Sequence, residues 1–249
     1  MQIYIKEYNQ LLKWLLINSL FIFCLIGFYY FGLIQSMLSS DKSYISFVIL
    51  IVYFITSLHA LIKIFNISSK IKNIFIVKDK IETNEKSIIT IEDLKGLFLI
   101  NDNKKNYKYF YQEYISNIIT KTQKTDNKNF DQQILLQLFA DKLNKQLKIG
   151  LLVSDMMLKL GLLGTIVGFI LMLAPISNID AYDVSTLKTA LSSMSGGMAI
   201  ALFTTLAGLV GGILLRTQYY LLDEANEELF SNIAQISETK IIPIIINSK

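Results

Sequence analysis

Three threonines in apolar surroundings are the main candidates for chemistry in this chain. Thr165 lies in the run LGLLGTIVGFILMLAP, residues 160–175. Thr204 and Thr205 lie in the run GGMAIALFTTLAGLVGGILL, residues 196–215. A hydroxyl group there can hydrogen-bond water, a carboxyl group or a partly dehydrated cation, but it does not titrate usefully. The structural alternative is a hydrogen bond from the hydroxyl to a backbone carbonyl of the preceding helical turn.

Charged residues are scarce around these threonines. Asp155 and Lys159 are one helical turn apart and can pair, either as an interfacial salt bridge or as a contact at the cytoplasmic mouth of a pathway. Farther along, residues 160–179 and 189–215 contain no Asp, Glu, His, Lys or Arg. A proton relay needs a titratable group. If this protein helps to move an ion, another chain must therefore supply that group.

The residue sets typical of enzymes are missing from the sequence. It has no Gly-rich phosphate loop, no paired carboxylate site, no metal-ligand spacing and no nucleophile beside a base. The lone Cys24 excludes a disulfide within the chain, and the lone His59 belongs to no cluster. Arg216 is the single arginine, although nucleic-acid readers rely on arginine forks. We therefore expect no catalytic residue, no metal, no cofactor and no nucleic-acid partner.

The composition predicts a membrane protein. Hydrophobic residues make up 52% of the 249 residues, which is high for a soluble domain with so few charges. Four apolar stretches are long enough to cross a bilayer, at about residues 14–37, 44–65, 152–175 and 193–215. The fold class we expect is an all-α integral membrane protein with four transmembrane helices and a helical cytoplasmic domain.

The distribution of positive charge predicts the orientation. Lysines precede the first stretch, follow the second and precede the third, whereas each short connection between stretches holds one lysine. Both termini and the long middle segment should therefore be cytoplasmic. The predicted divisions are an outer transmembrane hairpin, residues 1–65; a cytoplasmic helical domain, 66–150; an inner, channel-lining hairpin, 151–215; and a cytoplasmic amphipathic helix, 216–249.

Small residues repeat at helical spacing on the last two predicted membrane helices. They are Gly161, Gly164, Gly168, Gly197, Ala201, Gly208 and Gly212. The first two helices are instead bulky and aromatic. Because small faces let helices approach each other or a partner closely, we expect the last two helices to be shielded from lipid by the first two.

Apolar stripes predict helices in the polar segments as well. Residues 66–78 should continue the second membrane helix, 92–120 should hold two short helices, and 129–150 should run unbroken into the third membrane helix. The last of these stripes is Ile134, Leu135, Leu138, Leu143 and Leu147. Residues 216–238 should form an amphipathic helix that ends before Pro243.

The runs LGLLGTIVG, residues 160–168, and AIALFTTLAGL, residues 199–209, together resemble the MotA/TolQ/ExbB proton channel family. The resemblance covers about residues 155–216. It implies a homopentamer in the bacterial inner membrane around a dimer of a single-pass MotB/ExbD/TolR-like protein that carries an aspartate. It also implies that H+, or in some members Na+, passes along Thr165 and Thr205, which face that aspartate.

The subfamily stays open. Ile200 stands where TolQ and ExbB proteins carry a glutamate, and four membrane helices match the layout of MotA. Flagellar MotA proteins carry a proline near the inner end of the third membrane helix, where this chain has Leu158. They carry another at the inner end of the fourth, where this chain has Arg216 and no proline beside it. We therefore expect an ion-driven motor subunit that works on a periplasmic or outer-membrane target. The alternatives are a passive membrane scaffold, a sodium-coupled flagellar-type stator and a small-solute transporter.

Overall fold

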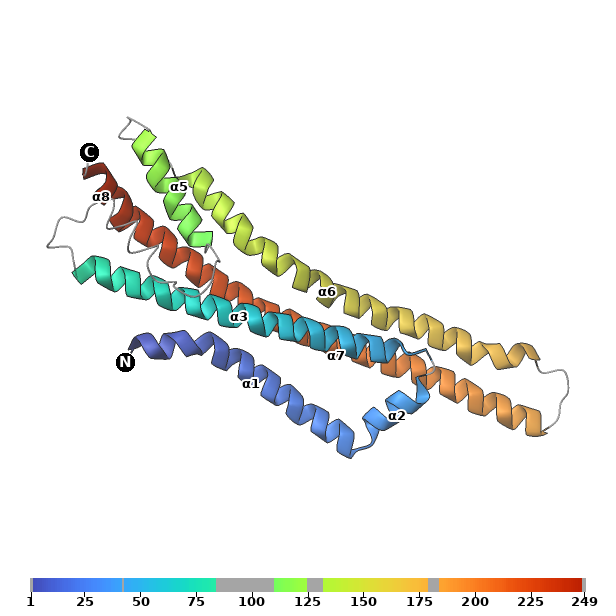
Figure 1. Ribbon diagram of the computed structural model, residues 1–249. Helices are drawn as coiled ribbons and strands as arrows, with labels where there is room; N and C mark the ends of the chain where they lie inside the picture. Colours follow the sequence, from blue (N-terminus) through green and yellow to red (C-terminus); the bar gives the residue numbers. More distant parts are fainter. Residues whose placement is uncertain (1, 42, 84–109, 125–131, 179–183, 248–249) are drawn as a thin grey trace. The chain divides into compact units, whose positions relative to one another are not determined.

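The computed structural model describes residues 2–41, 43–83, 110–124, 132–178 and 184–247, and these residues form helices joined by short turns (Figure 1). Within them there is no strand, so the all-α prediction is confirmed. The elements are α1 (Gln2–Tyr30), α2 (Leu33–Ser40), α3 (Ile45–Thr83), α5 (Phe110–Lys124), α6 (Gln133–Leu173), the 3-10 helix η1 (Ala174–Asn178), α7 (Val184–Ile236), the π-helix η2 (Ser237–Ile241) and α8 (Ile242–Asn247).

Four of the described helices are long and apolar enough to cross a membrane. Their apolar ranges are Leu11–Tyr30, Ile45–Ile76, Gln133–Ile176 and Leu187–Ile245. The prediction of four membrane helices is therefore confirmed. The sides on which the two ends of the chain lie stay predictions.

The expectation of one continuous helix over residues 14–37 is wrong. Helix α1 ends at Tyr30, and Gly32 follows in the left-handed conformation with φ 70°. Helix α2 then starts at Leu33. A single left-handed residue breaks the backbone hydrogen-bond ladder, and glycine adopts that conformation without a steric penalty. The apolar composition continued across this point and hid the break.

The chain divides into two compact units, which we describe separately. The first, called here the polar unit, holds residues 1–11, 63–147 and 222–249; the second, the apolar unit, holds residues 12–62 and 148–221. Helices α1, α3, α6 and α7 each contribute residues to both units. The outer, inner and cytoplasmic roles that we assign to segments of the sequence stay predictions.

A cluster of buried side chains forms the core of the apolar unit. Ile49 and Tyr53 from α3 pack with Met157 from α6 and Leu215 from α7. Phe21 from α1 meets Tyr53 edge to face, with ring centroids 5.2 Å apart. This cluster connects the bulky helices α1 and α3 to the small-faced pair α6 and α7.

In the polar unit, the stripes predicted for α3 and α7 are buried. They comprise Ile67, Ile71 and Ile74 on α3 and Leu222, Ala225, Leu229, Ile233 and Ile236 on α7. Helix α6 runs unbroken from Gln133 to Leu173, as predicted. On that helix Leu143 and Leu147 are buried, but Ile134 and Leu138 are 65% and 55% exposed, so core packing, which we expect for most of these stripes, holds for only part of this one. Of the segment predicted to hold two short helices, residues 92–109 lie outside the described residues.

The C-terminal helix ends differently from the prediction. The α-helical part of α7 ends at Ile236, and the π-helix η2 follows. Beside it, the buried Tyr114 hydroxyl donates to Gln132 Oε1 at 3.0 Å and lies 3.3 Å from Ser237 Oγ. Helical structure then continues through α8, where Pro243 is the second residue. Proline is tolerated in the first turn of a helix, so Pro243 does not end this segment.

Candidate functional site

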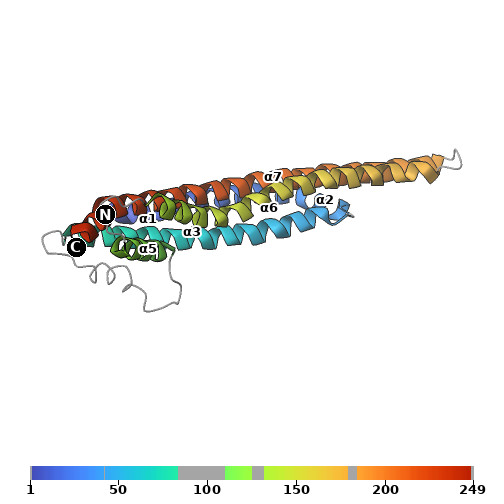
Figure 2. The same cartoon turned by 90° about the horizontal axis from the view of Figure 1, so that it is seen from above.

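Helices α6 and α7 pack against each other in the apolar unit, and the candidate site is built on this pair (Figures 1 and 2). Buried residues recur on α6 at alternating spacings of three and four: Ser154, Met157, Gly161, Gly164 and Gly168. Their partners on α7 are Gly197, Ile200, Thr204, Gly208, Gly211, Gly212 and Leu215. This spacing places both sets on the facing sides of two helices.

Glycines on the two helices bring the backbones into direct contact. A Cβ on Gly208 would lie 2.7 Å from the Gly161 Cα, and one on Gly168 would lie 2.6 Å from the Ala201 nitrogen. A Cβ on Gly197 would lie 2.5 Å from the Met172 nitrogen. Real Cβ atoms do not come this close, so the contact requires glycine. In the described chain, the glycine-rich face of α6 is therefore packed against that of α7.

That packing changes what the small residues can do. We expected these glycines to let the inner helices pass closely along a partner helix, but in the described chain they lie between α6 and α7. The outward sides of the pair carry bulky apolar residues instead. They include Leu162, Ile166, Phe169 and Ile170 on α6 and Met198, Leu202, Leu206, Leu209 and Ile213 on α7. A second helix would meet those residues first.

One hydroxyl group joins the helices by a hydrogen bond, and a second lies close to the backbone of the facing helix. Ser154 Oγ donates to the Gly212 carbonyl oxygen at 2.8 Å, and Thr205 Oγ1 lies 3.3 Å from the Gly161 carbonyl oxygen. Side-chain hydrogen bonds between helices in a bilayer contribute about 0.6 kcal/mol each on average. Our reading of the sequence missed Ser154 and Gly211. The signal that would have found Ser154 is its place seven residues before Gly161 on the buried face.

The three threonines differ in their surroundings. Thr204 is fully buried, its hydroxyl donates to the Ile200 carbonyl oxygen at 2.9 Å, and a Cβ on Gly164 would lie 2.2 Å from its oxygen. Thr204 therefore fills the space that Gly164 leaves open. Thr165 and Thr205 are half-buried instead.

All three hydroxyl groups use their hydrogen atom within the chain. Thr165 donates to the Leu162 carbonyl oxygen and Thr205 to that of Ala201 at 2.9 Å. A hydroxyl oxygen that has donated its hydrogen keeps lone pairs that accept. Thr165 and Thr205 therefore offer acceptors, which suit a protonated carboxyl group, a hydrated proton or a metal cation. Their role as ion-pathway residues stays a prediction.

The charged residues at the end of the pair do not interact as expected. Asp155 forms an ion pair with Arg216 of α7, with 3.7 Å between Oδ1 and Nη1. In the part of the chain that the structure describes, no ion pair joins Asp155 to Lys159. Both partners of the observed pair are more than half exposed, so it contributes at most about 1 kcal/mol. The predicted pairing of Asp155 with Lys159 is wrong, because Arg216 reaches Asp155 from the neighbouring helix.

Ile200 occupies the position where the resemblance led us to consider a glutamate. Its side chain is 2% exposed. A carboxylate enclosed in this way would need a partner for its charge.

Among the described residues, no group of three His, Cys, Asp or Glu side chains comes close enough to hold a metal ion.

Comparison with known protein families places most of the candidate site within a family model. Residues 103–235 match the family model described as the MotA/TolQ/ExbB proton channel family. This range includes α5, α6 and almost all of α7, and it is more than half of the 249 residues. No curated protein and no solved structure matches the chain.

Proposed function

The chain belongs to the MotA/TolQ/ExbB proton channel family, and from that premise we propose that it is the large subunit of an ion-driven motor. Membership makes it a component of ion-driven machinery in a membrane. The finer proposal is that a single-pass partner of the MotB/ExbD/TolR type supplies the titratable aspartate. The α6–α7 pair then forms the surface along which this aspartate is loaded and unloaded.

Two features together support this proposal: the glycine-rich stretches of the two helices lack titratable residues, and their half-buried threonines offer hydrogen-bond acceptors. Residues 160–179 and 189–215 contain no titratable acid or base. The polar side chains there include Thr165 and Thr205, which are half-buried and whose hydrogen atoms are already donated to backbone carbonyls. Such a surface can accept a hydrogen bond from a protonated group of a partner, but none of its own side chains can take up the proton.

The proposed mechanism follows from those acceptors. A protonated carboxyl group donates to a threonine oxygen, whereas a carboxylate has no hydrogen to donate. Thr165 and Thr205 therefore hold the partner aspartate more strongly after it has taken up a proton. Thr204 plays no part in this step, since its side chain is packed against Gly164. The translocated ion is H+, and Na+ is the alternative that the same oxygen atoms could bind.

The proposed assembly is a homopentamer around a dimer of the partner in the bacterial inner membrane, with both ends of the large subunit in the cytoplasm. The exposed apolar residues on the outward sides of α6 and α7 support this assembly, since no other part of the described chain covers them. Neighbouring subunits, the partner helices and the lipid bilayer would cover them.

Substitution of the two threonines tests the mechanism. We expect Thr165→Val and Thr205→Val each to abolish ion-dependent function while the purified complex keeps its composition. Thr217→Val is the matched control, because Thr217 is also on α7 and also donates to the carbonyl four residues earlier, at 2.9 Å. Normal function in both Thr165→Val and Thr205→Val would refute the assigned roles.

Particle images of the purified complex test the assembly. A five-fold ring around two central helices supports the proposal, and any other symmetry counts against it. A ring without a partner and without ion flux in vesicles would favour a passive scaffold. Flux that follows a Na+ gradient and ignores a pH gradient would favour a sodium-coupled stator.

A further inference from the structure

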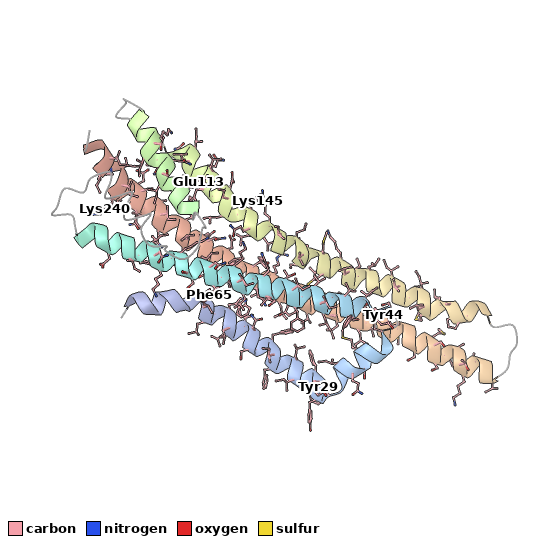
Figure 3. The ribbon with its side chains drawn as sticks, viewed as in Figure 1. Tyr29, Tyr44, Phe65, Glu113, Lys145 and Lys240 are labelled. Atoms are coloured by element: carbon pink, nitrogen blue, oxygen red, sulfur yellow. The ribbon has the colours of Figure 1, made fainter. Side chains whose placement is uncertain are left out.

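A small cluster of polar side chains lies inside the apolar unit, between α1, α3 and α7. Its centre is Gln218 of α7, whose side chain is 0% exposed. Gln218 Nε2 donates to Asn18 Oδ1 of α1 at 3.0 Å and to the Tyr53 hydroxyl oxygen of α3 at 3.3 Å. Figure 3 shows side chains of α1 and α3 in the space between these helices, on the stretch that precedes Tyr29 and follows Tyr44. One amide group therefore contacts two other helices.

The backbone of α1 determines how the two amide groups of this cluster are turned. Asn18 Nδ2 donates to the Trp14 carbonyl oxygen, one helical turn earlier, at 2.9 Å. Asn18 therefore presents its oxygen to α7. Gln218 must meet that oxygen with its nitrogen, because an amide oxygen in the same place would face another acceptor. The oxygen of Gln218 is consequently turned away from Asn18 Oδ1.

Two buried atoms of this cluster have no hydrogen-bond partner among the described residues. They are Gln218 Oε1, which is an acceptor, and Trp14 Nε1, which is a donor. A buried polar atom that loses its hydration and gains no partner is destabilising, so folded proteins pair such atoms with protein groups or with ordered water. The two atoms are complementary, and both residues hydrogen-bond to Asn18.

A water molecule matches this set of atoms. It accepts a hydrogen bond from Trp14 Nε1 and donates one hydrogen to Gln218 Oε1. Its second hydrogen can go to Asn18 Oδ1, because an amide oxygen that accepts from Gln218 keeps another lone pair. Buried waters typically make about three hydrogen bonds of this kind. A cation would face the indole N–H, which cannot coordinate it, and an anion would face two amide oxygens.

We propose that Trp14, Asn18 and Gln218 bind one internal water molecule, and that this water joins α1 to α7 within the apolar unit. Tyr53 contacts the nitrogen of the Gln218 amide and is not a ligand of the water. The site contains none of the three threonines, so it is independent of the motor function proposed above.

Nuclear magnetic resonance of the indole group tests the water directly. Trp14 is the only tryptophan, so protein with isotopic nitrogen in tryptophan alone gives one indole signal, which Trp14→Phe should remove. In detergent with deuterated chains, we expect a nuclear Overhauser effect between this indole proton and water, together with slow hydrogen exchange. Slow exchange without the effect would mean a dry contact, and fast exchange would mean open solvent. Either result would overturn the proposal.

Substitutions on both sides of the amide identify the ligands. Gln218→Met removes the acceptor at similar side-chain length, so the Overhauser effect should vanish. Gln235→Met, the same substitution at an exposed position of α7, is the matched control and should keep it. Tyr53→Phe should also keep it, because the lost hydroxyl does not contact the water. Retention of the effect in Gln218→Met, or its loss in Tyr53→Phe, would show that the assigned ligands are wrong.

Thermal unfolding tests whether the water joins the two helices. Trp14→Phe and Gln218→Met each remove a ligand of the same water, so the double variant should lower the unfolding temperature by less than the sum of the single shifts. Trp14→Phe combined with Gln235→Met should give additive shifts. Additive shifts for Trp14→Phe with Gln218→Met would mean that the two side chains share no partner, contrary to the proposal.

Discussion

A Cβ on Gly197 would lie 2.5 Å from the backbone nitrogen of Met172 on the facing helix. The two helices of the candidate site thus touch through their backbones, and no side-chain rotation can relieve the clash. The neighbouring Gly196 has nothing within 4 Å of its own added Cβ. Two adjacent glycines therefore have opposite tolerance for a methyl group.

We predict that Gly197→Ala destabilises the purified protein by about 1–3 kcal/mol, the usual cost of overpacking a close contact. Gly196→Ala, which adds the same methyl group to the same helix at an open position, should not destabilise the protein, because alanine favours a helix over glycine. Thermal unfolding in detergent measures both. Equal stability of the two variants would show that α6 and α7 do not meet at Gly197.

The turn between α1 and α2 should depend on Gly32. Its φ of 70° is costly for a residue with a Cβ, so Gly32→Ala should destabilise the protein by about 1–2 kcal/mol. Gly27 makes a good control, because it lies in α1 with open space around its Cβ position and no positive φ. If Gly27→Ala lowered the unfolding temperature as much as Gly32→Ala, the left-handed turn would be refuted.

Stability at low pH should depend on Asp41, which lies outside the membrane-spanning helices. Its Oδ2 accepts the Ser46 backbone N–H at 2.8 Å, and its Oδ1 accepts that of Ser43 at 2.9 Å. Burial raises the pKa of Asp41, but hydrogen bonds from Ser43 and Ser46 outweigh it and hold the pKa below the usual 3.8.

Because the folded-state pKa is lowered, the stabilisation by Asp41 is complete above pH 3.8 and is lost as the pH falls through the folded-state value. Asp41→Ala should cost about 1 kcal/mol at neutral pH, because it removes the side chain that accepts the backbone N–H groups of Ser43 and Ser46. It should also reduce the loss of stability on acidification. Asp141→Ala, at an exposed position on α6, is the control for removal of a carboxyl group that caps no helix.

The buried network beside η2 should stabilise the polar unit. Tyr114→Phe removes the hydroxyl that donates to Gln132 Oε1 at 3.0 Å, and we expect a loss of about 1 kcal/mol. Burial, followed by the charge of Glu238, raises the pKa of Tyr114, so the hydroxyl stays protonated at neutral pH. Tyr220→Phe, at a position 68% exposed, should be neutral. Hydrogen exchange of residues 237–241 would show faster opening in Tyr114→Phe, and unchanged exchange would contradict the network.

Much of the fold could be predicted from the sequence because the spacing of apolar residues indicates where helices form and which side of each is apolar. The stripes on α3 and α7 predicted burial correctly, since a 3.6-residue period identifies one side of a helix. The same reasoning failed for Ile134 and Leu138, which are exposed although they share the period of Leu143 and Leu147. A period shows that a side is apolar, but it does not show whether another element of the same chain covers it.

The candidate site was predictable in its residue types and less so in its contacts. The glycine repeat indicated close packing, and the packing is observed, but only the structure shows that the glycines of α6 and α7 face each other. Asp155 has two cations within reach, and spacing along one helix favoured Lys159. The neighbouring helix brings Arg216 to it instead.

The sequence by itself determined the helical class, the number of membrane-length helices and the family, because composition, length and a local motif carry these properties. Only the tertiary structure decided which helix faces touch and where α1 breaks. These features depend on residues distant in the sequence or on one backbone dihedral angle. A hydropathy pattern averages over many neighbouring residues, so it shows neither contacts between distant residues nor a single dihedral angle.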